Sequence, residues 1–148
     1  MATLRAVVKS TLEANTPLMA LLTGGIKDAS VLDFTGEGAN QAPRAADGVT
    51  LLPHAVIRWG EVSPNGSGLK IGDEAETFEV YVHQDTGFDV IESALIKIKK
   101  LLHDVYLTAD DRALAHVNKV FTSGEIPAEE LGNAACRFVR FAVITAPI

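Results

Sequence analysis

The sequence predicts an α+β fold, in which an antiparallel or mixed sheet of about four to five strands carries one long helix and the N-terminal helices on one face. Three observations lead to this prediction. Between Thr77 and Val105 a strand pattern passes directly into a long amphipathic helix. Helical patterns come first in the chain and most strand patterns follow, an order typical of α+β domains. The length of 148 residues fits a single domain, 1–148.

The segment from Thr77 to Val105 gives the clearest signal. Apolar and polar residues alternate from Phe78 to His83, which is the two-residue period of a half-buried strand. The helical stripe that follows repeats at steps of three and four residues and consists of Phe88, Ile91, Leu95, Ile98 and Leu102. Thr86 and Asp89 form a capping-box pattern, so we expect Thr86 to cap this helix. This segment predicts part of a hydrophobic core and contains no catalytic or ligand-binding motif.

Two helices are expected at the N-terminus. Apolar residues at helical spacing predict an amphipathic helix from Leu4 to Ala14, with Thr3 as its cap. Pro17 suits a first helical turn and predicts a second, short helix that ends at Gly24-Gly25. A short strand is expected next, around Val31 to Phe34.

Two polar segments are expected to form loops. The segment from Thr35 to Thr50 is rich in Gly, Ala, Asn and Asp and has no periodicity, so it predicts a long loop. Such a loop is either an arm that contacts a partner or a disordered surface loop. After Pro53, a strand from His54 to Glu61 and a turn over 63–68 predict a hairpin with the central strand and an exposed tip.

The C-terminal third is ambiguous in places. Periodicity alone fits a capped helix and a strand equally well over 107–122. Pro127 and the residues after it suggest one helical turn within a loop. The last strand, Cys136 to Thr145, carries apolar residues on both faces, so we expect it at the centre of the sheet or under a cover. Arg137 and Arg140 fall on opposite faces of that strand and therefore need acidic partners or water.

Composition argues against several classes of function. The formal net charge is −6, which is a poor basis for binding nucleic acid. Cys136 is the single cysteine, so no internal disulfide is expected, and a buried inert thiol is expected there. No stretch approaches the roughly 20 apolar residues of a membrane span, and no signal-peptide pattern opens the chain. We therefore expect a protein of the cytosol, or of a particle assembled there, without a membrane partner.

No catalytic, metal or cofactor motif stands out. The four histidines, His54, His83, His103 and His116, lack metal-ligand spacing, and the acidic residues from Asp73 to Glu79 lack the spacing of a calcium loop. Neither a phosphate-binding glycine loop nor a hydrolase nucleophile elbow is present. We expect no enzyme activity, no cofactor and no metal. An enzyme is the alternative to a structural protein: it would be a small cytosolic enzyme with a site around His54, His83 and acidic neighbours.

Five parts of the chain together form a known layout. They are the helix from Leu4 to Ala14, Thr16-Pro17-Leu18 with the stop at Gly24-Gly25, the strand Pro53 to Ile57, the strand Thr77 to Val82 with the helix Phe88 to Leu102, and the strand Arg137 to Val143. This layout resembles the tail terminator, or tail-completion, proteins of long-tailed bacteriophages. The segments Thr35 to Thr50 and Ser63 to Ile71 depart from it. In similar proteins the region matching Arg112 to Phe121 pairs with the last strand, which favours a strand there.

The resemblance implies a structural role in a virion. Proteins of this family form a six-fold ring on the finished tail tube, stop the addition of tube subunits and offer the surface to which the head connector attaches. The implied partners are copies of the same chain, the tail tube protein and a head–tail connector or adaptor, while DNA passes through the channel without specific binding. The implied place is the tail or neck of a virion assembled in the host cytoplasm. Another neck or tail component, such as a head–tail adaptor or a tube-like protein, is the alternative.

Contacts with neighbours are expected at the two long loops and on the last strand. Loop length and polarity favour the segment Gly36 to Asp47 and the tip Asn65 to Lys70. The candidate interface residues are Gly36, Glu37, Asn40, Arg44, Asp47, Asn65, Lys70, Arg137 and Arg140. Edge strands or arms that pair with neighbours suit the assembly of a ring.

Overall fold

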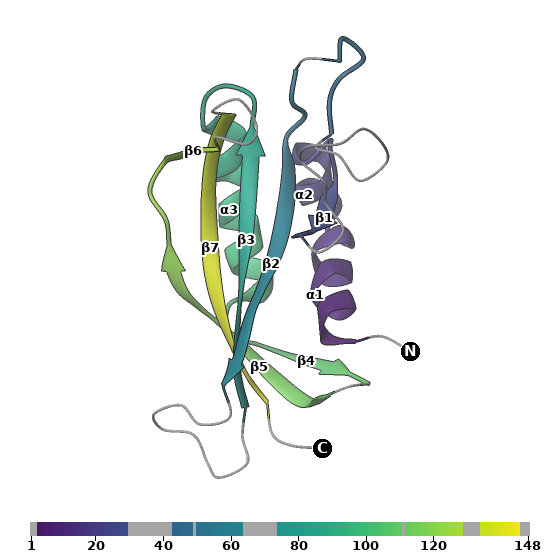
Figure 1. Ribbon diagram of the computed structural model, residues 1–148. Helices are drawn as coiled ribbons and strands as arrows, with labels where there is room; N and C mark the ends of the chain where they lie inside the picture. The colour runs from purple at the N-terminus through teal and green to yellow at the C-terminus, as the bar shows by residue number, and fades with distance from the viewer. Residues whose placement is uncertain are drawn as a thin grey trace.

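A computed structural model describes residues 3–29, 43–48, 50–63, 74–110, 112–128 and 134–145. Its centre is one curled sheet of seven strands with the order β1-β2-β3-β7-β5-β4, in which β6 also pairs with β7 (Figure 1). The strands are β1 (Ile26–Asp28), β2 (His54–Ser63), β3 (Glu74–Gln84), β4 (Val105–Ala109), β5 (Arg112–Thr122), β6 (Ile126–Ala128) and β7 (Ala134–Thr145). Strands β1 and β2 pair in parallel and the other pairs are antiparallel, so the sheet is mixed.

The sheet has more strands than the four to five predicted. Residues 105–122 form a hairpin of two strands, β4 and β5, and two three-residue strands, β1 and β6, extend the sheet. Pro127 lies in strand β6 and not in the expected helical turn, whose later residues, 129–132, are outside the described residues. Strands this short cannot be predicted from periodicity, because three residues do not establish a period. The α+β class, the hairpin of β2 with β3 and the pairing of β5 with β7 are confirmed.

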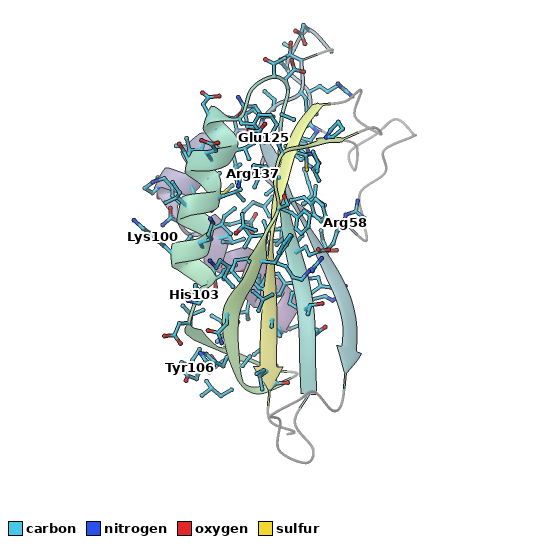
Figure 2. The ribbon with its side chains drawn as sticks, turned by 90° about the vertical axis from the view of Figure 1, so that its left-hand side faces the viewer. Arg58, Lys100, His103, Tyr106, Glu125 and Arg137 are labelled. Atoms are coloured by element: carbon cyan, nitrogen blue, oxygen red, sulfur yellow. The ribbon has the colours of Figure 1, made fainter. Side chains whose placement is uncertain are left out.

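Three helices cover one face of the sheet: α1 (Leu4–Glu13), α2 (Thr16–Leu21) and α3 (Asp89–Leu102) (Figures 1 and 2). Their apolar side chains join the inward-facing residues of β2, β3, β5 and β7 in one core. The Thr3 hydroxyl accepts a hydrogen bond from the N–H of Ala6, and the Asn15 side chain accepts one from the N–H of Leu18. Within the described ranges, no helix is long and apolar enough to cross a membrane.

The start of α3 differs from the prediction. Thr86 does not cap the helix, since the cap position makes no side-chain hydrogen bond. Gln84 satisfies the free amides in its place: its Oε1 accepts from the N–H groups of Val90 (3.1 Å) and Ile91 (3.3 Å), and its Nε2 donates to Asp89 Oδ1 (2.6 Å). The bond from Gln84 is the main cause that lowers the pKa of Asp89. A buried amide at the end of β3 therefore fixes the junction between strand and helix.

The region between α2 and β2 is only partly described. A short strand lies at Ile26–Asp28, while the position predicted for it, Val31 to Phe34, is outside the described residues. Most of the predicted loop from Thr35 to Thr50 is also outside them. The described end of that loop folds back on itself through an antiparallel bridge between Arg44 and Leu51.

Strand β7 lies between β3 and β5, as its two apolar faces predict. Its helix-side core residues are fully buried: Val139, Phe141 and Val143. Phe141 stacks on Phe78 of β3 with ring centroids 5.1 Å apart. On the opposite, outer face of the sheet, Phe138 is partly exposed and Ile144 is 39% exposed. The helices therefore cover one apolar face of this strand, and the other stays open to contact.

Candidate functional site

The outer face of the sheet, opposite the helices, carries arginine and aromatic side chains that touch one another. We call this cluster the outer-face patch, and its members are Arg58, Glu79, Tyr81, Phe121, Phe138 and Arg140. The strand register produces it, because Tyr81 lies opposite Phe138 and Glu79 lies opposite Arg140 on β3 and β7. Figure 2 shows Arg58 on the side of the sheet away from the helices.

Arg140 is held in the middle of the outer-face patch. Its Nη2 and Nε donate to Glu79 Oε2 at 2.8 and 3.1 Å, and its guanidinium lies 5.5 and 5.7 Å from the ring centroids of Phe121 and Phe138. The Tyr81 hydroxyl donates to Glu79 Oε1 at 3.3 Å, and burial is the main cause that raises the pKa of Tyr81. The Arg140 side chain is still 43% exposed and Phe121 is 47% exposed. The patch is therefore ordered within the subunit and accessible from outside.

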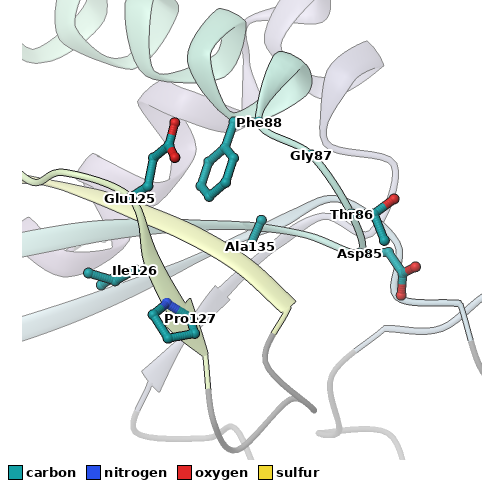
Figure 3. Close-up of a pocket in the computed structure, with 8 residues that line it drawn as sticks. All are labelled: Asp85, Thr86, Gly87, Phe88, Glu125, Ile126, Pro127 and Ala135. Carbon is teal, nitrogen blue, oxygen red and sulfur yellow. The ribbon is translucent and has the colours of Figure 1, made fainter.

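A shallow pocket of about 440 Å³ lies where β3 meets α3 and where β6 runs beside β7 (Figure 3). Its described lining is Asp85, Thr86, Gly87, Phe88, Glu125, Ile126, Pro127 and Ala135. Most of this lining is apolar, and two carboxylates, Asp85 and Glu125, belong to it. Asp85 is already engaged, since its Oδ1 accepts from the N–H of Leu51 at 3.0 Å. The described lining contains no imidazole, thiol or amine that would pair with a carboxylate as a catalytic group.

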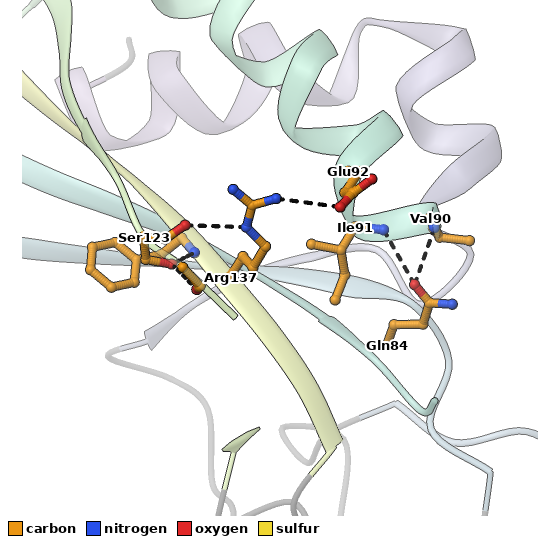
Figure 4. A network of polar contacts seen from close by, with 8 residues as sticks. Gln84, Val90, Ile91, Glu92, Ser123 and Arg137 are labelled. Atoms are coloured by element: carbon orange, nitrogen blue, oxygen red, sulfur yellow. Dashed lines mark hydrogen bonds and ion pairs between the residues drawn. The ribbon is translucent and has the colours of Figure 1, made fainter. Parts of the chain in front are cut away.

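Arg137 lies on the helix side of β7 and joins three elements (Figure 4). Its Nε donates to the carbonyl of Ser123 at 3.2 Å, and its Nη1 lies 3.7 Å from Glu92 Oε1 on α3. The Ser123 hydroxyl in turn accepts from the N–H of Phe138 at 2.8 Å. Arg137 and Arg140 lie on opposite faces of β7, as predicted, and of the two options predicted for them, acidic partners or water, each has an acidic partner. With its side chain 22% exposed, Arg137 ties the subunit together, and its contact with a neighbour stays a prediction.

The described end of the long loop carries two of the predicted contact residues. Asp47 accepts from the N–H and the hydroxyl of Thr50 at 2.9 and 2.6 Å, and Arg44 forms the bridge with Leu51. Both Arg44 and Asp47 are exposed. The other candidates lie outside the described residues: Gly36, Glu37, Asn40, Asn65 and Lys70. A contact between this loop and a neighbour stays a prediction.

Two histidines of the alternative enzyme hypothesis meet on the outer face. His54 and His83 are opposite residues on β2 and β3, and their rings stack with centroids 4.9 Å apart. His54 Nδ1 lies 2.9 Å from the Leu52 carbonyl oxygen, whereas His54 Nε2 and His83 Nδ1 are buried without a partner among the described residues. Burial is the main cause that lowers the pKa of both histidines, to about 3 for His83. Both rings are therefore neutral at pH 7.

The histidine pair belongs to a packed part of the structure. Cys136, opposite His83 on β7, is buried and packs with Leu51 and Ala134 in a small apolar cluster against which Tyr81 lies. Within the described ranges, no group of three or more His, Cys, Asp or Glu side chains could hold a metal ion. The acidic neighbours that the enzyme hypothesis needs beside the two rings do not appear in the described structure around them.

The other two histidines connect elements near the end of α3. His116 Nε2 lies 2.8 Å from Asp104 Oδ1, and the His116 ring stacks on Tyr106 with centroids 4.3 Å apart. His103 Nδ1 accepts from the N–H of Lys119 at 3.0 Å. Asp104 has φ +54°, a left-handed conformation that aspartate tolerates better than most residues. These contacts hold the hairpin of β4 and β5 against the helix layer.

No protein-family model matches this chain, and no curated protein matches it. Among the solved structures with a similar fold is a chain of a virion. It belongs to the structure of the virion of a native gene transfer agent (GTA) particle, and the TM-score is 0.66 at 19% sequence identity. The match covers 97% of this chain and 94% of that chain. At this identity the likeness concerns the fold, which the two chains share almost from end to end.

Proposed function

We propose that this chain is a structural component of a phage-like virion, and that it acts there as a tail terminator. In this role six copies form a ring on the finished tail tube, end the addition of tube subunits and offer a surface to the head connector. The observation that carries the proposal is the fold shared with a chain of a gene transfer agent virion over 97% of this chain. The terminator role within the virion comes from the resemblance of the sequence layout to that family.

The exposed side chains among the described residues support a role in binding other proteins and not in catalysis. Seven large apolar side chains are exposed: Ile96, Tyr106, Leu114, Val120, Phe121, Ile126 and Ile144. Aromatic residues and arginine are enriched in protein interfaces, and the outer-face patch combines both. A neighbouring subunit or the tube would cover such residues. We propose no catalytic step, cofactor or metal for this chain.

The charge of the chain suits a channel for DNA. Six copies carry a formal charge of −36, six times −6. Phosphates are repelled by a wall of the same sign, so DNA would slide through such a ring without binding to it. This part of the proposal predicts that the purified chain binds duplex DNA no better at low salt than an acidic protein of equal size.

Tail length tests the proposed function directly. In the particle that encodes this chain, deletion of its gene should give overlong tubes without heads, because nothing stops tube growth, and expression of the wild-type chain should restore the normal length. Electron microscopy measures both. A gold-labelled chain should mark one end of the tube. Label along the tube would indicate a tube-like protein, and label that stays with isolated heads and is absent from free tails would indicate an adaptor. Normal tails in the deletion strain would refute the terminator role.

The two long loops have their own test. Shortening the segment 36–47 or the tip 65–70 should leave the subunit folded, as circular dichroism shows, and weaken the binding of the chain to tube ends. Unchanged binding by a folded, shortened chain would remove these loops from the interface.

A further inference from the structure

Three lysines of this acidic chain gather around one hollow on its surface. Lys99 and Lys100 on α3, together with His103 and Lys119 of β5, line a shallow hollow of about 230 Å³. None of the ion pairs between described residues includes any of the three lysines. Burial, and then the nearby charges of Lys119 and Arg137, lower the pKa of Lys99. The hollow therefore concentrates positive charge that forms no ion pair with the described carboxylates.

The basic hollow lies along an open strand edge. Strand β4 pairs with β5 only as far as Val117, so no described strand lies beyond the rest of β5 on that side. The N–H of Lys119 points away from β7 and is satisfied by the His103 ring. Two exposed apolar side chains are close in sequence to these lysines, Ile96 one turn before Lys99 and Lys100 on α3 and Val120 next to Lys119 on β5, and each is 53% exposed. Positive charge beside exposed apolar side chains fits a polypeptide segment that carries an acidic and an apolar residue.

The hairpin of β4 and β5 has the complementary character at its end, which lies away from Lys119 along β5. Its turn contains Asp110, which is exposed, and the sequence places a second aspartate, Asp111, next to it. Leu114, near the same end of the hairpin, is 53% exposed. In Figure 1 the end of the hairpin projects to the lower right, past the lower end of α1, whereas α3 and β6 lie on the left. Figure 2 places Lys100 and His103 at the lower part of α3.

We propose that the end of this hairpin docks into the basic hollow of a second copy of the chain, with Asp110 facing the three lysines and Leu114 facing Ile96 and Val120. Each subunit then uses two different surfaces, and a contact of this kind forms a ring of identical chains when the rotation between neighbours closes. The number of copies in the ring rests on the proposed function. The contact between the hairpin of one copy and the hollow of the next has its own test. The charge outside the three lysines is −9 (−6 minus 3), which makes a second copy an electrostatically suitable occupant.

Zero-length cross-linking tests the contact. A carbodiimide joins carboxylates to amines that already touch, and an equal mixture of ¹⁴N- and ¹⁵N-labelled wild-type chain distinguishes links between copies from links within one copy. We expect mixed-isotope links from Asp110 to Lys99, Lys100 or Lys119 in a concentrated solution. Self-association without such links, or a chain that stays monomeric up to about 1 mM, overturns the proposal.

Charge reversal supplies the second readout. Asp110→Lys and Lys119→Glu should each weaken self-association at least tenfold in analytical ultracentrifugation, and the chain with both substitutions should recover most of it. Lys9→Glu, which changes the same charge on α1 and removes an exposed contact with Glu13, is the matched control and should have no effect. No loss in the single variants, or loss without recovery in the double variant, contradicts the contact.

Tube capping separates this inference from the proposed function. A wild-type chain that forms the cross-linked ring but leaves tube length unchanged would remove the terminator role and keep the contact. A chain that caps tubes and shows no link between hairpin and hollow would keep the terminator role and remove the contact.

Discussion

The buried pair of histidines predicts that acid destabilises this protein in a specific pH range. His83 is 5% exposed, its pKa is about 3 in the folded chain, and its ordinary value is 6.5. Between these two values the unfolded chain binds a proton at His83 that the folded chain does not. The stability is therefore fully present above pH 6.5 and is lost as the pH falls from 6.5 toward 3.

The size of the effect follows from those two values. At pH 5 the unfolded histidine is almost fully protonated and the folded one is not, so His83 alone lowers the free energy of unfolding by about 2 kcal/mol relative to pH 8. His54 stacks on His83 and has a pKa that is also lowered, so it acts in the same direction. Such a loss is a large share of the stability of a small domain.

Urea unfolding at pH 8 and pH 5, followed by circular dichroism, measures this difference. His83→Leu should reduce the loss between the two pH values by about 2 kcal/mol, whatever its effect at pH 8. Val82→Ala is the matched control: the residue is buried on the same strand and does not titrate, so the variant should be less stable at both pH values with the wild-type difference between them. If His83→Leu loses as much stability as the wild type on acidification, the buried neutral imidazole is not the cause.

Three further predictions concern stability and are measured by the same unfolding experiment. Gln84→Ala should cost about 1–2 kcal/mol, because two N–H groups of α3 lose their acceptor, while Thr86→Ala should be near neutral; equal costs would contradict the assignment of the cap. Phe141→Ala should cost about 3–5 kcal/mol, because it removes a fully buried ring that stacks on Phe78, and a cost under about 1 kcal/mol would refute this packing. Arg140→Met should cost less than about 1 kcal/mol, because its pair with Glu79 is partly exposed, and a larger cost would mean that the patch holds the fold.

The sequence predicted the elements whose periodicity spans several turns or strand residues. The stripe from Ile91 to Leu102, the alternation around Phe78 and the double-sided last strand all lie as expected, since each repeats often enough to define a period. The cap at Gln84 was missed because it depends on a side chain that reaches from the preceding strand to the helix. Local capping rules consider only residues next to the helix start.

The surface was predicted less well than the core. The meeting of His54 and His83 depends on the register of β2 and β3, which a long turn does not determine from sequence. The outer-face patch likewise needs the register of β3 and β7, whose partners lie about 60 residues apart in the chain. The need of Arg137 and Arg140 for acidic partners could be predicted from their opposite faces, but the partners themselves, Glu92 and Glu79, could not.

The position of β7 has a consequence for synthesis on the ribosome. This strand completes β3, β5 and β6 at once, yet it is the last of the described strands to be translated. A nascent chain that has not reached residue 134 therefore presents open backbone groups on both β3 and β5. The sheet is complete only after β7 has been synthesised and has paired with β3 and β5. Until then the growing chain needs protection from pairing with other incomplete copies.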